Sequence, residues 1–140
     1  MREILFKAKR VNNGEWVEGY YLRDQYHIGG KDIIFYRKDS DRFTAYTNII
    51  DIETLCQFTG LCDKNGNKIW ENDIVTCQTK YGGDIGKVVF HNGKFCVLWN
   101  STYHYSRNGK CENYYDINTK NSVKGNVFDN PELLQEKSDE

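Results

Sequence analysis

The stretch Val88-Val89-Phe90-His91-Asn92-Gly93-Lys94-Phe95-Cys96-Val97 decides the fold, because it predicts a β-hairpin of defined register. Asn and Gly both tolerate the positive φ that a two-residue type I′ turn requires. Pairing outward from the turn gives the cross-strand pairs His91/Lys94, Phe90/Phe95, Val89/Cys96 and Val88/Val97. Two of these pairs bring large apolar side chains onto one face, where cross-strand contacts stabilise an antiparallel sheet. The stretch therefore predicts two antiparallel strands with one buried face.

A second turn signal, Gly82-Gly83, precedes this hairpin and would set Val75 opposite Phe90. Together the two turns predict a three-stranded meander over residues 73–81, 84–91 and 94–99. The third of these strands is apolar on both faces. Such a strand is covered on both sides, as in a small barrel, or it meets a partner.

Similar turn chemistry predicts an N-terminal sheet. Asn13-Gly14 would set Val11 opposite Trp16, and Gly29-Gly30 would set Tyr26 opposite Ile33. The strands expected from these turns are 3–11, 16–23, 25–28 and 31–38. Of the remaining signals, Asn65-Gly66 and Asn108-Gly109, the second is the weakest, because it would place two like charges opposite each other. After the meander, Asn130 and Pro131 predict the start of a short C-terminal helix.

Composition supports a sheet-rich protein and excludes a helical bundle. The 140 residues include ten tyrosines, seven phenylalanines and three tryptophans. These aromatics together with Val, Ile and Thr far outnumber Ala, Leu and Met. Branched and aromatic side chains favour a pleated, half-buried surface, whereas helices favour unbranched ones. A chain of this length is expected to form one domain or two very small ones that share a core.

Charge and cysteine content restrict the compartment and the class of partner. Nineteen basic against twenty acidic residues give a net charge of −1, so the chain has no general attraction to nucleic acid or anionic lipid. The apolar runs are too short to span a membrane, and no signal peptide is recognised, so a cytoplasmic protein is expected. The five cysteines are odd in number and none belongs to a C-x-x-C pair. This favours reduced, mostly buried thiols and no metal site.

Two separated motifs resemble the signature of the YopX family of phage and prophage proteins. The first is Gln57-Phe58-Thr59-Gly60-Leu61-Cys62-Asp63-Lys64-Asn65-Gly66-Asn67-Lys68-Ile69-Trp70-Glu71-Asn72-Asp73-Ile74-Val75. The second is Gly125-Asn126-Val127-Phe128-Asp129-Asn130-Pro131-Glu132-Leu133-Leu134. The family has Gly where this chain has Asn72, and Asn is the next most tolerant residue at positive φ, so the turn is expected to survive.

The resemblance implies a mainly β fold of antiparallel hairpins, with an N-terminal sheet, a small SH3-like barrel and the short C-terminal helix. We expect a single YopX-like domain over 1–140, with an N-terminal β subdomain at 1–50, the SH3-like portion at 51–134 and a frayed tail at 135–140. The motif residues are interpreted as turn and core positions that encode the fold rather than an activity. They are Gly60, Leu61, Asp63, Asn65, Gly66, Ile69, Glu71, Asp73, Asn130 and Pro131.

Our first functional hypothesis is a non-enzymatic phage or prophage accessory protein that acts by binding a phage or host protein or by self-assembly. Residues 48–77 carry a net charge of −3, and residues 78–110 carry a net charge of +4. Opposite patches on two subunits can form a heterologous interface, and unpaired strand edges can accept a neighbour's strand. A homo-oligomer in the cytoplasm of an infected or lysogenic bacterium is therefore expected, with no cofactor and no membrane partner.

Two alternatives stay open. Basic residues interleaved with aromatics suit single-stranded nucleic acid, which is held by phosphate attraction and base stacking. The residues proposed for such a nucleic-acid-binding module are Lys87, Lys94, Trp99, Tyr103, His104, Tyr105 and Arg107. The other alternative is a metal-assisted enzyme that uses Asp63, Glu71 and Asp73. No recognisable catalytic constellation accompanies these carboxylates, so a non-enzyme is expected.

Overall fold

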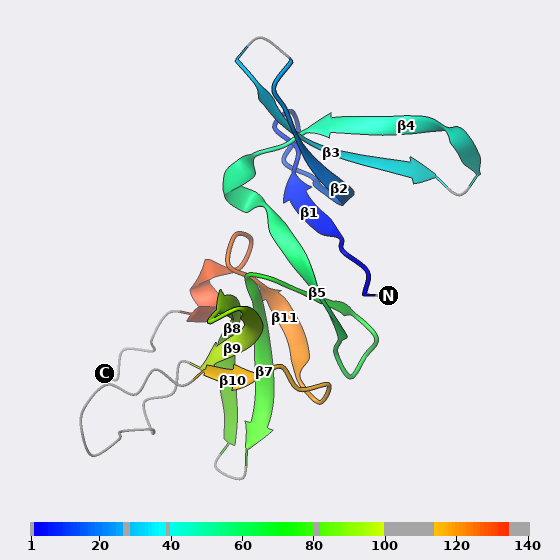
Figure 1. Ribbon diagram of the computed structural model, residues 1–140. Helices are drawn as coiled ribbons and strands as arrows, with labels where there is room; N and C mark the ends of the chain where they lie inside the picture. Colours follow the sequence, from blue (N-terminus) through cyan, green and yellow to red (C-terminus); the bar gives the residue numbers. More distant parts are fainter. Residues whose placement is uncertain (1, 27–28, 39, 80–81, 100–113, 135–140) are drawn as a thin grey trace. The chain divides into compact units, whose positions relative to one another are not determined.

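The computed structural model describes residues 2–26, 29–38, 40–79, 82–99 and 114–134, without the side chains of residue 42 and of residues 77–79 and 82–84 (Figure 1). The described chain is built almost entirely of antiparallel strands, which confirms the mainly β prediction. Contacts divide the chain into two compact units, Met1–Phe58 and Thr59–Glu140, referred to below as the N-terminal and C-terminal units.

The N-terminal unit is an antiparallel sheet with the strand order β4-β3-β2-β1-β5, and β5 continues into the C-terminal unit, where β6 is its neighbour. Its elements are β1 (Phe6–Lys9), β2 (Trp16–Asp24), β3 (Lys31–Lys38), β4 (Asp41–Ile49), the 3-10 helix η1 (Ile52–Thr54) and β5 (Cys56–Cys62). Side chains alternate between the two faces of such a sheet. One face buries a small core of Ala8, Val17, Ile34 and Ile50, against which Phe6, Tyr21, Tyr36 and Leu55 pack.

The end of β1 also pairs with the end of β4. Arg10 and Ile50 form a bridge, flanked by hydrogen bonds from Val11 N to Ile49 O (3.1 Å) and from Asp51 N to Lys9 O (2.9 Å). On its other side this segment bonds to β3, from Ile50 N to Asp32 O (3.0 Å). We call this junction the β1–β4 corner. It occupies the outer edge of β4 at its C-terminal end.

The C-terminal unit contains a second antiparallel sheet, with the order β10-β9-β8-β7-β11. The second sheet consists of β7 (Asp73–Thr79), β8 (Gly82–His91), β9 (Lys94–Trp99), β10 (Tyr114–Asp116) and β11 (Ser122–Asn126), and β6 (Lys68–Trp70) pairs with β5. Ile69, Val75, Val88 and Val97 are fully buried and form its core, with Trp99, Ile117 and Val123 packed around them. The described strand pairings leave β10 and β11 at the two edges.

The hairpin predicted from residues 88–97 is confirmed residue by residue. The observed partners are Val88↔Val97, Val89↔Cys96, Phe90↔Phe95 and His91↔Lys94. Asn92 and Gly93 have φ values of 49° and 80°, as a type I′ turn requires. The Phe90 and Phe95 rings meet edge to face at 5.0 Å, so the predicted pair also forms the predicted contact.

The register predicted at Asn13-Gly14 is wrong by two residues. Trp16 lies opposite Lys9 and not Val11, because the chain turns through a four-residue loop closed by hydrogen bonds from Arg10 N to Glu15 O and from Gly14 N to Arg10 O. Only Gly14 in this loop has a positive φ, so a type I′ turn cannot form.

Two further registers are also wrong. Leu22, not Tyr26, lies opposite Ile33, so the strand predicted over 25–28 is replaced by a longer β2. Gly86, not Phe90, lies opposite Val75, because β7 and β8 already pair at Thr79↔Gly82. Gly86 also lies opposite Trp99 in the next strand, where a Cβ atom would lie 2.5 Å from Val97 Cγ1 and 2.8 Å from the Trp99 ring, so only Gly leaves room for the indole. Strand β4 was missed altogether.

The regular C-terminal helix is not confirmed. Residues Pro131–Leu134 form only a 3-10 turn, η2, with a hydrogen bond from Leu133 N to Asn130 O (3.1 Å). Four residues are too few to propagate an α-helix, because nucleation costs more than so short a segment recovers. Cys56 and Cys96 are buried and in no disulfide, as expected for reduced thiols, and Cys56 Sγ donates to Thr54 O (3.3 Å), whereas Cys62 is exposed. None of the described helices is long and apolar enough to cross a membrane.

Candidate functional site

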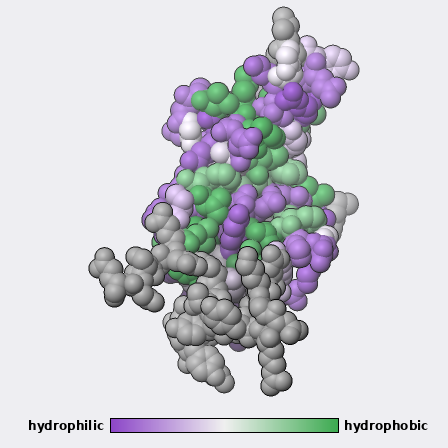
Figure 2. Space-filling view, turned by 90° about the vertical axis from the view of Figure 1, so that its left-hand side faces the viewer, coloured by the Kyte–Doolittle hydropathy of each residue, from purple (hydrophilic) through white to green (hydrophobic). Residues whose placement is uncertain are grey.

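The face of the N-terminal sheet opposite its core is apolar, although it is not covered by the rest of that unit. Tyr20 lies opposite Phe35, and Ile33 lies between Leu22 and Ile49 in neighbouring strands. Directly paired residues point to the same face, so five apolar side chains form one continuous group, which we call the outer face. Figure 2 shows apolar side chains at the surface of this unit beside polar ones.

Three members of the outer face are about half exposed: Tyr20 (52%), Leu22 (49%) and Ile49 (51%). The Tyr20 and Phe35 rings lie 5.6 Å apart and support each other. Beside this group, Trp16 is covered by the ammonium groups of Lys7 (4.6 Å) and Lys9 (5.5 Å). The outer face is therefore an apolar surface bordered by cations that are held in place.

The β1–β4 corner adjoins the outer face and carries two shallow cavities. One, of about 390 Å³, is lined by Val11, Asn12, Lys31, Thr47, Asn48 and Ile49. The other, of about 560 Å³, is lined by Lys9, Arg10, Val11, Gly14, Asp32, Ile50, Asp51 and Ile52. Val11 belongs to both, so the two hollows meet at an exposed apolar side chain.

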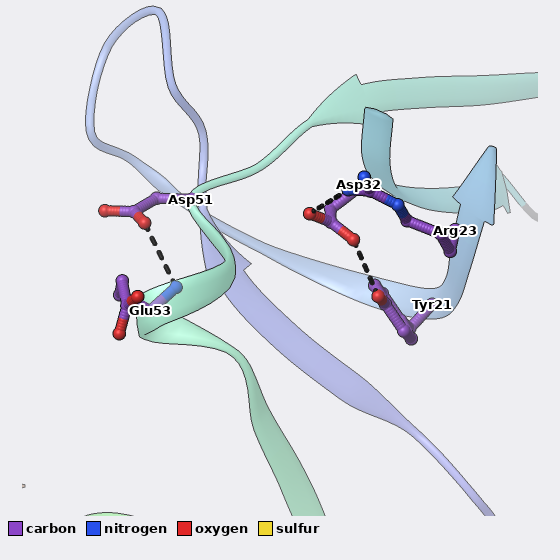
Figure 3. Close-up of polar contacts among 5 residues, drawn as sticks. All are labelled: Tyr21, Arg23, Asp32, Asp51 and Glu53. Atoms are coloured by element: carbon purple, nitrogen blue, oxygen red, sulfur yellow. Dashed lines mark hydrogen bonds and ion pairs between the residues drawn. The ribbon is translucent and has the colours of Figure 1, made fainter. Parts of the chain in front are cut away.

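The two carboxylates at the corner already have partners (Figure 3). Asp32 accepts a hydrogen bond from Tyr21 Oη (2.7 Å) and forms an ion pair with Arg23 (2.8 Å). The bond to Asp32, helped by burial, raises the pKa of the Tyr21 hydroxyl. Asp51 caps η1 by accepting a hydrogen bond from Glu53 N (3.1 Å). These acids therefore fix the corner and are not free to act as a base or a metal ligand pair.

In the C-terminal unit, the motif residue Asp63 is a structural clamp. Its carboxylate is 6% exposed and accepts hydrogen bonds from Asn65 N, Asn67 N and Val123 N, each 2.9 Å long, and from Asn67 Nδ2. Burial alone would raise the pKa of Asp63, but these donors outweigh it and the pKa is lowered. The clamp joins the Asp63–Asn67 turn to β11.

A second turn of the motif is held in a similar way. Asp73 is 2% exposed and accepts a hydrogen bond from Trp70 N (2.9 Å). Asn72 has a φ of 70°, which confirms that it replaces the family's Gly in the left-handed region, and it bonds to Val88 and Val127. Glu71, which precedes Asn72, is half-buried and has partners of its own. Both buried carboxylates thus accept hydrogen bonds from backbone N–H groups.

The other motif residues also occupy structural positions. A Cβ atom at Gly125 would lie 2.3 Å from Asn130 Oδ1, which explains the Gly, and Pro131 begins η2. Ile69 is fully buried, Gly60 and Gly66 have positive φ, and Leu61 is exposed. Within the described residues, no group of three His, Cys, Asp or Glu side chains is placed to hold a metal ion.

Of the seven residues predicted to bind nucleic acid, three lie among the described residues. Tyr103, His104, Tyr105 and Arg107 lie outside the described residues. Lys87 and Lys94 point to one face of the second sheet, whereas Trp99 lies opposite Gly86 on the other face, against the core. Lys94 is also paired with Asp116 (2.7 Å), which raises the pKa of the amine and lowers that of the acid.

An aromatic group that the sequence reasoning missed lies in the same sheet. Phe90 and Tyr115 are 56% and 47% exposed, and Tyr115 lies opposite Val97, next to Phe95 along β9. Phe90, Phe95 and Tyr115 therefore share one face. On the opposite face His91 stacks on Tyr114, with ring centroids 3.8 Å apart.

The outer face was also missed, although the sequence carries a signal for it. Ile33-Ile34-Phe35-Tyr36 is apolar on both faces of a strand, the same pattern that drew attention to residues 94–99. Finding the rest required the register, because Leu22 and Ile49 join the group only through their pairing with Ile33.

Comparisons with known proteins agree with the architecture and identify the family. No curated protein matches this chain. A crystal structure of protein EF1440 from Enterococcus faecalis matches with a TM-score of 0.53 at 22% identity, covering 96% of this chain and 100% of that chain, a likeness that extends to the fold. The model of the YopX protein family matches residues 5–135, in agreement with the resemblance of the two motifs. The chain therefore belongs to the YopX family.

Proposed function

We propose that this protein is a non-enzymatic accessory protein of a phage or prophage that works by binding other protein surfaces, including copies of itself. The observation that carries the proposal is the outer face of the N-terminal sheet. An antiparallel sheet with one face in water normally alternates apolar and polar residues, and this sheet does not. Contiguous exposed apolar patches in soluble proteins mark interaction sites.

In this proposal the C-terminal unit is the rigid support, a small SH3-like barrel in the cytoplasm of the bacterial host. Strands β7 and β9 are buried on both faces. Ile74 and Val75 in β7 are fully buried, and so are Cys96 and Val97 in β9. Neighbouring residues of a strand point to opposite faces, so a sheet buried on both sides must curl or be covered. That burial supports the barrel, and the saturated carboxylates of the motif support a role without catalysis.

The test is the oligomeric state of a variant with a charged outer face. We expect light scattering after size exclusion to give a mass above the monomer for the wild type at high micromolar concentration. The variant Leu22→Lys/Ile49→Lys should be monomeric, because each ammonium group would have to be desolvated in an apolar contact. Leu61→Lys, at an exposed apolar residue of the C-terminal unit, is the matched control. A monomeric wild type, or unchanged assembly of the double variant, would overturn self-association through this face.

A second candidate, single-stranded nucleic-acid binding, is favoured by the aromatic group Phe90, Phe95 and Tyr115. Exposed rings on one face of a small antiparallel sheet can stack with bases, each worth about 1–3 kcal/mol. Lys87 and Lys94 point to the other face of this sheet, so the phosphate attraction that such a site also needs would have to come from other residues. Titration of labelled DNA at two salt concentrations tests it: Phe90→Ala/Tyr115→Ala should abolish binding, and Tyr20→Ala should not. Absence of salt-dependent binding by the wild type would reject this function.

A further inference from the structure

We propose that the β1–β4 corner is an oxyanion-binding site, which takes a carboxylate or phosphate group on Arg10 and Asn48. The site adjoins the outer face, but its two donors point to the opposite side of the sheet, so it would exist whether or not the protein self-associates. Two buried nitrogen atoms at this corner, Arg10 Nε and Asn48 Nδ2, have no hydrogen-bond partner. Both are donors, and neither can accept a hydrogen bond, so only an acceptor can satisfy them.

The backbone places these two donors on the same side. Arg10 lies directly opposite Ile50, and Asn48 precedes Ile50 by two residues, so all three side chains point to the core face. Diagonal neighbours of this kind have Cβ atoms about 7–8 Å apart. An Arg and an Asn side chain can span that separation and meet at a single oxyanion of two or three oxygens.

The cost of the arrangement argues for a ligand. A buried donor without an acceptor destabilises a protein by about 1–3 kcal/mol, and native structures contain only a few such groups. Here two of the three found among the described residues lie at one corner, the third being Asn121 Nδ2. An oxyanion bound between Arg10 and Asn48 would recover both losses at once.

The two acids beside the donors are already engaged. Asp32, which lines the cavity beside Arg10, is paired with Arg23. Asp51, the remaining acid, is turned to the N–H of Glu53 (Figure 3). Arg10 lines the cavity of about 560 Å³ and Asn48 lines the one of about 390 Å³, and the two cavities meet at Val11. A guanidinium is the side chain best suited to a carboxylate or a phosphate.

Thermal unfolding of the full chain in the presence of three probes tests the site. The probes are inorganic phosphate, acetate, and the peptide acetyl-Gly-Glu-Gly-amide with its Gln counterpart as control. A probe that binds should raise the melting temperature of the wild type by about 3–5 °C at tenfold excess over its dissociation constant. A response to phosphate alone would assign the site to phosphate. A response to the Glu peptide and acetate would assign it to carboxylates, and no response to any probe would overturn the proposal.

Variants separate binding from folding. Arg10→Gln should remove the response to the probe, whereas the charge-matched Arg37→Gln should keep it. Asn48→Asp supplies an internal carboxylate beside Arg10, so it should raise the melting temperature without any probe and abolish the response. A circular dichroism spectrum equal to that of the wild type shows that each variant folds. A destabilised Asn48→Asp variant that still responds to the probe would contradict the assignment.

Discussion

The Asp63 clamp and the β1–β4 corner solve the same structural problem in opposite ways. Each joins chain segments that are distant in sequence, and each brings polar groups out of water. At the clamp, a single carboxylate accepts hydrogen bonds from four nitrogen atoms, so nothing is left for a ligand. At the corner, the backbone groups bond to one another and two side-chain donors remain unused. The fully hydrogen-bonded carboxylate is typical of a structural site, whereas side-chain donors without an acceptor indicate a place where a ligand can bind.

The largest effect that distinguishes the two regions should come from Asp63→Ala. The substitution leaves three backbone N–H groups and an amide without their acceptor, and we expect the free energy of unfolding to fall by about 3 kcal/mol. Urea unfolding monitored by tryptophan fluorescence measures it. The matched change at the corner, Arg10→Gln, should cost almost nothing. Equal losses in the two variants would remove the distinction.

Gly86→Ala should have the next largest effect. Side chains pack closely around Gly86 in the C-terminal unit, whereas the turn at Gly14 in the N-terminal unit has free space around it. A Cβ atom at Gly86 would overlap Val97 and the Trp99 ring, and we expect a loss of about 2 kcal/mol. At Gly14 a Cβ atom would meet nothing within 4 Å, and only its φ of 72° resists substitution, at about 1 kcal/mol. The melting temperatures of the two variants measure this difference in stability. A greater loss of stability in Gly14→Ala than in Gly86→Ala would contradict the prediction.

Acid and alkali should weaken the two units selectively. The pKa of Asp63 is lower in the folded state than in the unfolded chain, so its contribution is complete above the unfolded pKa and is lost as pH falls through the folded pKa. The pKa of Tyr21 is raised, so its contribution is complete below the unfolded pKa and is lost as pH rises through the folded pKa.

The expected result is loss of the C-terminal unit first in acid and of the N-terminal unit first in alkali. Amide signals in nuclear magnetic resonance spectra report each unit separately across the pH range. Asp63→Asn should reduce the acid dependence of the C-terminal unit, and Tyr21→Phe the alkaline dependence of the N-terminal unit. Simultaneous loss of both units at each extreme would show that these two groups do not govern the difference.

The smallest effect on stability should come from the outer face. Leu22→Thr introduces a β-branched residue that suits a strand and removes a side chain that is half exposed, so the free energy of unfolding should change by less than about 0.5 kcal/mol. Association measured by light scattering should nevertheless weaken. A large loss of stability in the isolated protein would mean that the outer face is part of the core.

The fold class, one hairpin and the family could be predicted from the sequence, whereas three registers and the candidate sites could not. Asn92-Gly93 succeeds because both residues adopt positive φ, while at Asn13-Gly14 only the Gly does, and the loop widens. At Val75 the register is shifted because β7 and β8 already pair at Thr79↔Gly82, ahead of the Gly82-Gly83 signal. The unused donor of Asn48 depends on a bridge between Arg10 and Ile50 that no local pattern indicates.

The bond from Val123 N to Asp63 spans 60 residues, and this separation has a consequence for the order of folding. Hairpins such as 88–97 close short loops and form in microseconds, whereas closing a long loop costs more chain entropy before any contact repays it. Strand β11 can reach β7 only across the whole meander, so we expect it to dock last. Asp63, which lies before the meander in the family motif, therefore gains its hydrogen bond from Val123 only when β11 docks, late in folding.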